Sequence, residues 1–143
     1  MFTLEVPFAS PAYDETVRLR DEILRKPLGL SFTAEDLALE FESIHLACYN
    51  RQWELMACLV LVWKGDNLKM RQVAVDERYQ RRGIGQFLVA ASERVAANYG
   101  AQKLVLNARE TAVPFYQKLA YSIDGNRFEE VGIPHFKMYK DLS

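Results

Sequence analysis

The stretch Gln80-Arg81-Arg82-Gly83-Ile84-Gly85 decides how this chain is interpreted. It lies between a strand predicted over residues 68–75 and a helix whose apolar residues recur at three- and four-residue steps from Ile84 to Tyr99. The first N–H groups of a helix have no partner within it, and the helix dipole adds partial positive charge there. Glycine lets a diphosphate approach the backbone, so the loop predicts an anion site.

Two familiar nucleotide-binding patterns do not fit this loop. A P-loop ends in Gly-Lys-Ser or Gly-Lys-Thr, and neither follows here. A dinucleotide fingerprint needs a third glycine or an alanine where Leu88 stands, and an acidic residue where the chain has Lys103-Leu104-Val105. The short pattern alone therefore leaves two interpretations: the pyrophosphate of coenzyme A, or a helix start without a ligand.

The rest of the chain reads as strands followed by alternating strands and helices. Three apolar runs separated by turn residues predict an antiparallel meander, and Gly100 is a natural end for the long helix. The order predicts a mixed α/β layered domain rather than a doubly wound one, with residues 1–143 as a single domain. The expected strands are 2–7, 43–49, 54–64, 68–75, 103–106, 121–123 and 135–139, and the expected helices are one from Ser10 that Pro27 and Gly29 end, then 33–39, 84–99 and 112–119. Trp53 and Trp63 are expected to pack on strands.

Composition excludes several classes of protein. Basic and acidic side chains number 18 and 19, so we expect no nucleic-acid partner and no anionic membrane partner. No apolar run approaches the roughly 20 residues that cross a bilayer, and the N-terminus lacks the pattern of a signal peptide. Cys48 and Cys58 lie in apolar runs, which predicts buried thiols, and neither CxxC nor HxxxH occurs. We therefore expect a cytoplasmic protein without a metal.

Residues 73–88 resemble the signature segment of the GNAT superfamily of N-acetyltransferases, whose loop reads Q/R-x-x-G-x-G/A. Gln80 to Gly85 matches this loop at every fixed position. A second match follows in Leu106-Asn107-Ala108 and in the segment 112–121, which ends Phe115-Tyr116-Gln117-Lys118-Leu119-Ala120-Tyr121. The family usually has Gly and Phe at the last two positions. The tail 130–138 is similar to a bacterial subgroup of small acetyltransferases.

The resemblance implies a mixed, mostly antiparallel central sheet that is flanked by helices and splayed at the cofactor site, between the 68–75 and 103–106 strands. Pantetheine would lie in this split. The implied activity is transfer of an acetyl group from acetyl-CoA to a primary amine of a small molecule or protein. A non-catalytic acyl-CoA-binding sensor or scaffold, and a protein-interaction domain without a ligand, are the alternatives. The sequence leaves a homodimer open.

The resemblance also assigns residues to the cofactor. Backbone N–H groups from Arg81 to Gln86 would hold the pyrophosphate, with Arg81 and Arg82 adding charge or remaining a solvated pair. A backbone N–H near Val73 would meet the oxyanion. The implied cofactor-binding set is Val73, Ala74, Val75, Gln80, Arg81, Arg82, Gly83, Ile84, Gly85, Gln86, Asn107, Phe115 and Tyr116.

The resemblance implies some catalytic groups through a motif and others only through their position in the chain. Tyr116 matches the tyrosine that protonates the departing thiolate in many family members, although a tyrosine packed at the core edge would look the same. Asn107 would bond pantetheine or a water, or simply end its strand. The general base has no motif. Glu40, Glu42 and His45 lie where the acceptor site is usually bordered, and His135 is a further candidate; His45, His135 and Glu42 are retained.

Overall fold

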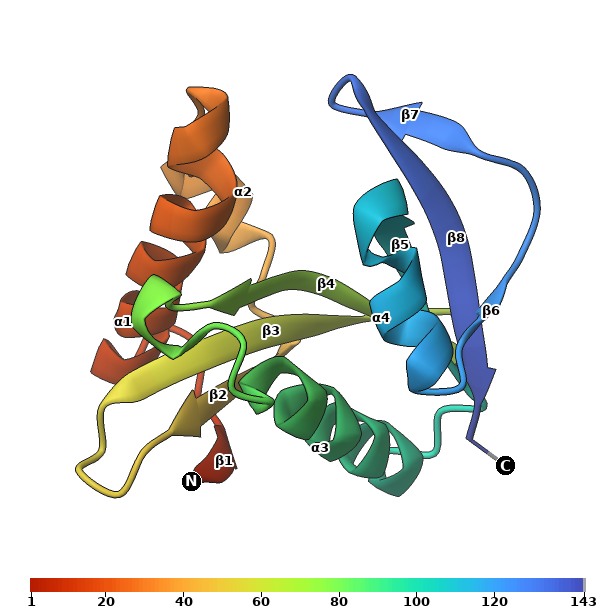
Figure 1. Ribbon diagram of the computed structural model, residues 1–143. Helices are drawn as coiled ribbons and strands as arrows, with labels where there is room; N and C mark the ends of the chain where they lie inside the picture. The colour runs from red at the N-terminus through yellow and green to blue at the C-terminus, as the bar shows by residue number, and fades with distance from the viewer. Residues whose placement is uncertain (143) are drawn as a thin grey trace. The chain divides into compact units, whose positions relative to one another are not determined.

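The structure is a computed structural model that describes residues 1–142 (Figure 1). The chain divides into two compact units, of which the first comprises Met1–Val62 and Gln72–Ser92, and the second comprises Trp63–Arg71 and the chain from Glu93 onward. Two strands and one helix pass from one unit into the other: β3 (Leu55–Lys64), β4 (Asn67–Val75) and α3 (Ile84–Asn98). The predicted single domain over residues 1–143 stays a prediction.

The first unit begins with elements whose ends are set by capping side chains. Ser10 Oγ accepts the N–H of Tyr13 at 3.1 Å and so starts the first helix. Thr33 and Asp36 form a reciprocal capping box at the second helix. Both helix starts confirm the sequence prediction. The elements are β1 (Phe2–Glu5), α1 (Pro11–Arg20), a π-helical turn (Asp21–Arg25), a 3-10 turn (Lys26–Leu28), α2 (Ala34–Ala38) and β2 (Ile44–Tyr49).

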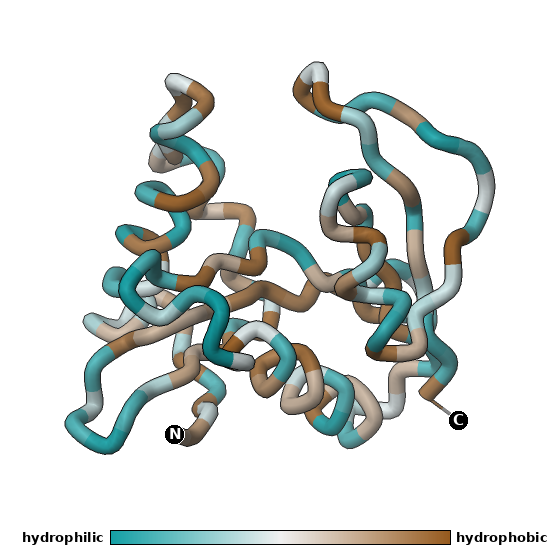
Figure 2. The backbone as a smooth tube through the Cα atoms, viewed as in Figure 1, coloured by the Kyte–Doolittle hydropathy of each residue, from teal (hydrophilic) through white to brown (hydrophobic). Residues whose placement is uncertain are grey.

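Strand β3 forms the centre of the first unit. Residues 56–61 are buried without a break, as expected of a strand covered on both faces, and Figure 2 shows this stretch as largely apolar. Helix α1 covers one face, where Leu19 packs against Cys58 and Ala74. Cys48 and Cys58 are free and buried, as predicted. Burial raises the pKa of the Cys58 thiol to about 12, so it stays protonated.

The second unit is built on the long final strand. Strand β5 (Lys103–Arg109) pairs with β8 (Ile133–Asp141) along its whole length, from Lys103 opposite Asp141 to Arg109 opposite His135. Even-numbered residues of β5 are buried and odd-numbered ones are half-buried or exposed, so one face of this pair is open. The remaining elements are a 3-10 turn (Glu110–Ala112), α4 (Val113–Lys118), β6 (Ser122–Ile123) and β7 (Phe128–Glu130).

The strands follow the hydrogen-bonded order β1-β2-β3-β4-β5-β8-β6, with β7 added to β8. The pair β4–β5 is parallel, whereas β1–β2, β2–β3, β5–β8, β6–β8 and β7–β8 are antiparallel. The sheet is therefore mixed, mostly antiparallel and flanked by helices, which confirms the predicted fold class.

Strand β7 escaped the sequence analysis because its turn is unusual. Val131 and Gly132 connect β7 to β8 as a two-residue loop, with φ angles of 53° and 71°. Positive φ at both positions is the geometry of a type I′ turn, for which Asn-Gly is the usual sequence. A β-branched valine at the first position is a conformational outlier, so no turn signal marks this hairpin.

Burial differs from the prediction at three aromatic side chains. Trp53 is 65% exposed and Trp63 is 41% exposed, so neither is packed into a strand face as expected. Trp53 lies in the turn between β2 and β3, where its ring lies 4.8 Å from that of Phe2. Tyr99, the last residue of the predicted apolar stripe, is also exposed, and Ala96 is buried instead. The stripe thus holds only for the earlier turns of α3.

Helix α4 ends in a Schellman motif formed without glycine. The N–H of Tyr121 donates to the carbonyl of Tyr116, and the N–H of Ala120 donates to that of Gln117, both at 3.0 Å. The rings of Tyr116 and Tyr121 meet edge to face at 5.6 Å. Ala120 has φ 72°, the left-handed conformation that glycine adopts without strain. The turn forms despite the departure from Gly-Phe, and Ala120 is strained.

Replacing Ala120 by Gly should therefore stabilise the protein. Relief of the left-handed strain, worth about 1–2 kcal/mol, exceeds the loss from a more flexible unfolded chain, about 0.4–1 kcal/mol. We expect the melting temperature in scanning calorimetry to rise by roughly 2–4 °C. Ala90→Gly within α3 is the matched control and should lower it, because glycine costs about 1 kcal/mol in a helix interior. An unchanged or lower melting temperature for Ala120→Gly would contradict the strain.

Candidate active site

The predicted phosphate loop joins strand β4 to helix α3 in the first unit. A 3-10 turn over Glu77–Tyr79 follows β4. The Nε2 group of Gln80 donates to the carbonyl oxygen of Val75 at 3.0 Å. The N–H of Phe87 donates to the carbonyl oxygen of Gly83 at 3.1 Å, which starts the helical bonding of α3. Gln80 thus fastens the loop to the end of β4.

The loop is exposed from Gln80 to Gly83, and its backbone is left-handed at two separate residues. Arg81 and Gly83 adopt left-handed φ angles of 64° and 76°, on either side of Arg82. Alternation of this kind forms concave nests of N–H groups that bind anions. The N–H groups of residues 84–86 precede the first helical bond and so have no partner within α3. Together with the positive end of the helix dipole, they favour an anion at this loop.

Charged side chains around the loop divide into a neutralised pair and two unpaired cations. Arg78 contacts Asp76 through Nε and Nη2 at 3.2 and 3.1 Å. Within residues 1–142, Arg81 and Arg82 make no ion pair with a carboxylate. The guanidinium of Arg82 lies 6.0 Å from the centroid of the Tyr79 ring. Two positive charges beside the nest therefore remain available to a ligand.

Strand β4 continues beyond its pairing with β5. The parallel ladder joins Leu68–Met70 to Leu104–Leu106, whereas β4 runs on to Val75. Gln72 has φ 55°, and a left-handed residue within a strand is typical of a β-bulge that re-aims the chain. In the described chain, β5 gives no register partner to Val73, whose backbone on that edge needs another partner.

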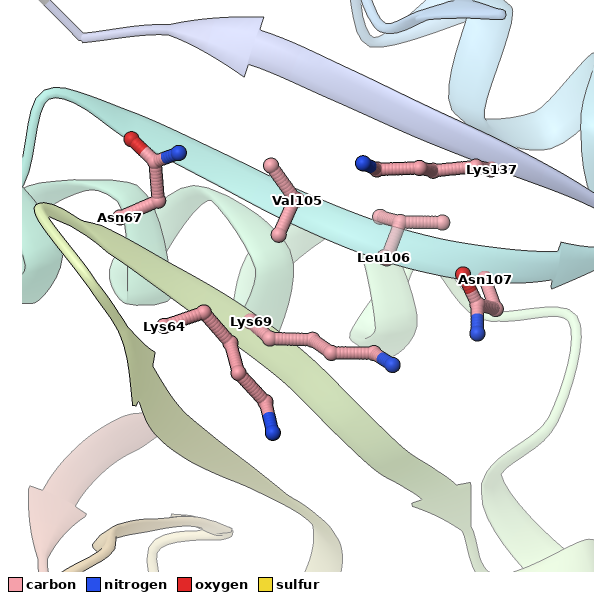
Figure 3. Close-up of a pocket in the computed structure, with 7 residues that line it drawn as sticks. All are labelled: Lys64, Asn67, Lys69, Val105, Leu106, Asn107 and Lys137. Carbon is pink, nitrogen blue, oxygen red and sulfur yellow. The ribbon is translucent and has the colours of Figure 1, made fainter. Parts of the chain in front are cut away.

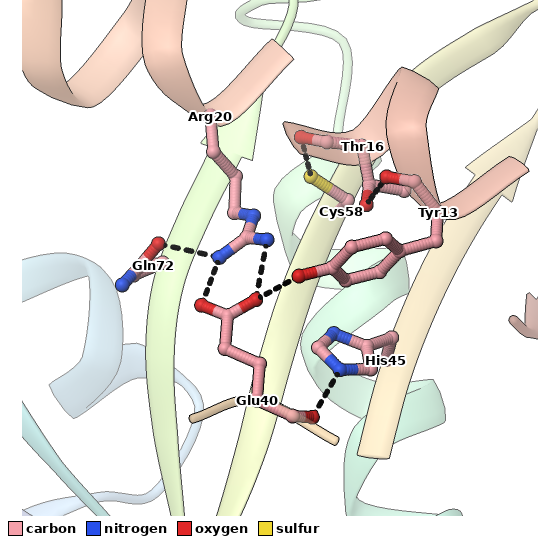
Figure 4. Close-up of polar contacts among 7 residues, drawn as sticks. All are labelled: Tyr13, Thr16, Arg20, Glu40, His45, Cys58 and Gln72. Carbon is pink, nitrogen blue, oxygen red and sulfur yellow. Dashed lines mark hydrogen bonds and ion pairs between the residues drawn. The ribbon is translucent and has the colours of Figure 1, made fainter. Parts of the chain in front are cut away.

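A buried ion pair contacts the side chain of Gln72 (Figure 4). Arg20 of α1 is fully buried and contacts both carboxylate oxygens of Glu40, at 2.9 and 2.8 Å. Its Nη1 also donates to Oε1 of Gln72 at 2.7 Å, and the Tyr13 hydroxyl donates to Glu40 at 2.7 Å. The cluster joins α1, the segment after α2, and β4.

Electrostatics keep this cluster in one protonation state. Burial would raise the pKa of the Glu40 carboxyl, but hydrogen bonds from Arg20 and Tyr13, with the charge of Arg20, outweigh it and lower that pKa. Burial and the adjoining carboxylate raise the pKa of the Tyr13 hydroxyl. Glu40 is therefore a permanent anion whose oxygens already accept three hydrogen bonds, which suits a structural role rather than that of a base.

His45 and Glu42 lie close to the cluster but differ in access. His45 is 2% exposed, and its Nε2 lies 3.0 Å from the carbonyl oxygen of Glu40. Burial lowers its pKa, so the ring is neutral, and its buried Nδ1 has no partner in the described chain. Glu42 is exposed. The ring of His45 is thus held by the backbone, while the Glu42 carboxylate faces solvent.

Tyr116 lies on α4 in the second unit. Its ring contacts those of Phe115 and Tyr121, at centroid distances of 5.0 and 5.6 Å. Burial raises the pKa of the Tyr116 hydroxyl to about 12, and no residue of the described chain hydrogen-bonds this hydroxyl. The neighbouring Tyr121 hydroxyl donates to Glu93 at 2.9 Å. Tyr116 therefore carries a protonated, unpaired hydroxyl at neutral pH.

Asn107 and His135 share the open face of the second unit. Asn107 is half-buried on β5 and lines a pocket of 440 Å³. His135 lies on β8, where its Nδ1 is 2.7 Å from the carbonyl oxygen of Ile133. That contact engages Nδ1, and Nε2 on the other side of the ring lies 3.5 Å from a carboxylate oxygen of Glu130. The ring stacks on Phe128 at 5.9 Å.

Residues 1–142 contain neither a metal-ligand cluster nor a membrane-spanning helix. No group of three or more His, Cys, Asp or Glu side chains is placed to hold a metal ion. No helix combines the length and the apolar character needed to span a bilayer.

Comparisons with known proteins agree with this geometry. The family model described as an acetyltransferase (GNAT) domain matches residues 34–142. The chain belongs to this family. The uncharacterized N-acetyltransferase YjcF of Bacillus subtilis (strain 168) is 32% identical over 124 residues, which cover 86% of this chain and 88% of YjcF. The predicted family and enzyme class, an acyl-CoA-dependent N-acetyltransferase, are thereby confirmed.

Solved structures share the fold of this GNAT domain. An aminoglycoside 6′-N-acetyltransferase complexed with coenzyme A superposes with a TM-score of 0.83 at 18% identity, covering 100% of this chain and 98% of that one. Escherichia coli ElaA gives a TM-score of 0.81 at 18% identity, covering 98% of this chain and 99% of ElaA.

The predicted site residues of this GNAT acetyltransferase fall into both units. Those of β4, the loop and α3, from Val73 to Gln86, belong to the first unit, together with Glu42 and His45. Asn107, Phe115 and Tyr116 belong to the second unit, as does His135.

The sequence analysis missed the cluster around Arg20. Tyr13, Thr16 and Arg20 are all buried on one face of α1, at a helical spacing of three and four residues. An arginine in such a stripe signals an inward-facing charge that needs a carboxylate. The signal was therefore present for Arg20, but nothing local identifies its partners at positions 40 and 72.

Removing the carboxylate of Glu40 should destabilise the protein. Glu40→Gln leaves the buried charge of Arg20 uncompensated, which costs roughly 3–5 kcal/mol in the free energy of unfolding measured with urea. Glu42→Gln, two residues away and exposed, is the control and should stay within about 0.5 kcal/mol. A loss below 1 kcal/mol for Glu40→Gln would show that the ion pair does not hold the fold.

The same pair predicts a dependence on pH. The folded-state pKa of Glu40 is lowered, so its contribution is complete above the ordinary carboxyl pKa of about 4.3 and disappears as pH falls through the lower folded value. Between about pH 5 and pH 3, the wild type should therefore lose stability more steeply than Glu40→Gln. Parallel urea midpoints for the two proteins across this range would contradict the assignment.

Proposed function

We propose that this protein transfers an acetyl group from acetyl-CoA to a primary amine of a small molecule or protein. The observation that carries the proposal is the segment from Gln80 to Gln86, where a backbone nest, a helix start and two unpaired arginines coincide. These features suit a pyrophosphate. Residues 80–85 also resemble the signature loop of the family.

The cofactor is proposed to bind mainly to the backbone. The N–H groups of residues 81–86 hold the pyrophosphate, and Arg81 and Arg82 add charge. Pantetheine pairs with the β4 backbone at Val73 and Val75, beyond the ladder with β5. The left-handed φ of Gln72 turns the following peptide out of regular strand geometry, which suits the Val73 N–H to stabilise the oxyanion of the tetrahedral intermediate.

Tyr116 is the proposed general acid. The amine nitrogen attacks the thioester carbonyl carbon, the tetrahedral intermediate collapses with cleavage of the C–S bond, and the Tyr116 hydroxyl gives its proton to the departing sulfur. A pKa raised to about 12 by burial keeps the hydroxyl protonated at every pH at which the enzyme would work. Its lack of a partner in the described chain leaves the proton free for transfer.

His135 is the proposed base among the three candidates. Its Nδ1 is engaged by the carbonyl of Ile133, which orients the ring, and its Nε2, beside the Glu130 carboxylate, is the nitrogen proposed to take the proton of the amine. His45 has its unpaired nitrogen fully buried, and Glu42 has no group that orients it in the described chain.

Cytoplasmic location, homodimerisation and the lack of nucleic-acid or membrane partners stay predictions.

Removing the hydroxyl of Tyr116 should separate chemistry from binding. We expect Tyr116→Phe to lower kcat by about 100-fold, as measured by release of free thiol, because one proton-transfer group contributes 10²–10⁴-fold. The dissociation constant of acetyl-CoA, measured by calorimetry, should change by less than about twofold. Tyr121→Phe, in the same ring cluster, should keep kcat. Equal kcat for both variants would refute the role, and a protein without thiol release or acetyl-CoA binding would refute the function.

Strain at Gly83 offers a test of the loop. Gly83→Ala introduces a Cβ at φ 76°, which distorts the nest, and we expect acetyl-CoA to bind at least tenfold more weakly in calorimetry. Gly125 has φ 86° and equally open surroundings, so Gly125→Ala carries the same backbone strain at a turn of the second unit. It should leave the affinity unchanged. A similar loss of affinity in both variants would mean that global stability, not the loop, governs binding.

A further inference from the structure

The pocket on the open face of the second unit is lined by ammonium groups from three strands (Figure 3). Lys64 comes from β3, Lys69 from β4 and Lys137 from β8. The lining is completed by Asn67, Val105, Leu106 and Asn107. Figure 3 shows the Lys69 side chain running along β4 toward the amide of Asn107. The pocket thus combines positive charge with two amides that can hydrogen-bond to oxygen.

The positive charge of this pocket is poorly balanced by the protein. Lys137 approaches Asp124 at 3.7 Å, but both side chains are more than half exposed, so the pair is weak. Within residues 1–142, neither Lys64 nor Lys69 makes an ion pair. Burial and the charge of Arg71 lower the pKa of Lys69, the charge of Glu130 partly opposes them, and Lys64 and Lys137 add smaller lowering effects. An anion in the pocket would offset this repulsion.

We propose that the lysine pocket binds an anionic group, a carboxylate or phosphate, of the amine acceptor. This inference rests on the proposed acetyl transfer. Charge-assisted bonds from Lys69 and Lys137, with the Asn107 amide, would hold the oxygens. The substrate class is therefore amines that carry a second, anionic group.

The register of β5 and β8 relates this pocket to the proposed base. Asn107 lies opposite Lys137, and Arg109 lies opposite His135. Residues two apart on a strand share a face, so His135 and Lys137 lie on the same face of β8, about 7 Å apart along the strand. An acceptor anchored by its anion at Lys137 would extend its amine along β8 toward Nε2 of His135.

Matched pairs of acceptors test this inference. Each pair consists of an ω-amino carboxylic acid or ω-amino alkyl phosphate and its uncharged carboxamide or alcohol. We expect the wild type to favour the anionic member at least tenfold in kcat/KM, because a hydrogen bond to a charged group contributes more than one between neutral groups. Lys69→Gln and Lys137→Gln should remove this preference while retaining activity on the uncharged member. Lys103→Gln, on the same strand face but outside the pocket, should keep it.

Three outcomes would overturn the proposal. One is equal kcat/KM for both members of every pair, and another is an unchanged preference in Lys69→Gln. The third is a loss of affinity in Lys69→Gln for coenzyme A but not for dephospho-coenzyme A, which would give the pocket to the cofactor.

A binding measurement keeps the inference separate from the proposed function. If no amine is acetylated and acetyl-CoA does not bind, the proposed function fails, and inorganic phosphate titrated into the ¹⁵N-labelled full chain tests the pocket alone. Shifts at Lys69, Asn107 and Lys137 that vanish in Lys69→Gln would support an anion site. The absence of such shifts at millimolar phosphate would overturn it.

Discussion

The buried charge of Arg20 is the constraint on which the first unit depends. A guanidinium without exposure must be neutralised, because an isolated ion in the interior costs several kcal/mol. Glu40 supplies the charge and Gln72 a further acceptor, so three segments remote in sequence must meet at one point. The contact at Gln72 falls on the left-handed residue of β4, directly before Val73. The ion pair that holds α1 in place thus also fixes the backbone proposed to bind the oxyanion.

Local rules predicted most of the fold because most elements carry their own signals. Ser10 and Thr33 marked two helix starts, and the continuous apolar run of β3 marked a long strand. The failures have a common cause. Trp53 follows a turn rather than a strand, and β7 is closed by Val131 at a φ angle that valine rarely adopts. At such positions tertiary contacts decide the conformation, and residue preferences point elsewhere.

Left-handed residues illustrate which features of the site could be predicted from the sequence and which could not. Gly83 adopts a left-handed conformation, which a glycine in a loop makes predictable. The same conformation occurs at three residues other than glycine, Arg81, Gln72 and Ala120, so residue type did not predict it there. Strain of this kind persists only where surrounding contacts over-determine the backbone. At Gln72 the contact is the hydrogen bond from Arg20, and at Ala120 it is the Schellman motif of α4.

The two proposed binding sites differ in a way that explains their visibility. A pyrophosphate held by consecutive N–H groups requires particular residues at adjacent positions, so the site leaves a short motif from Gln80 to Gly85. A pocket built from side chains on one sheet face draws on every second residue of several strands. Lys64, Lys69 and Lys137 span more than half the chain and share no pattern. A site that binds through the backbone can therefore be predicted from a short stretch of sequence, whereas the proposed acceptor site can be identified only once the pairing of the strands is known.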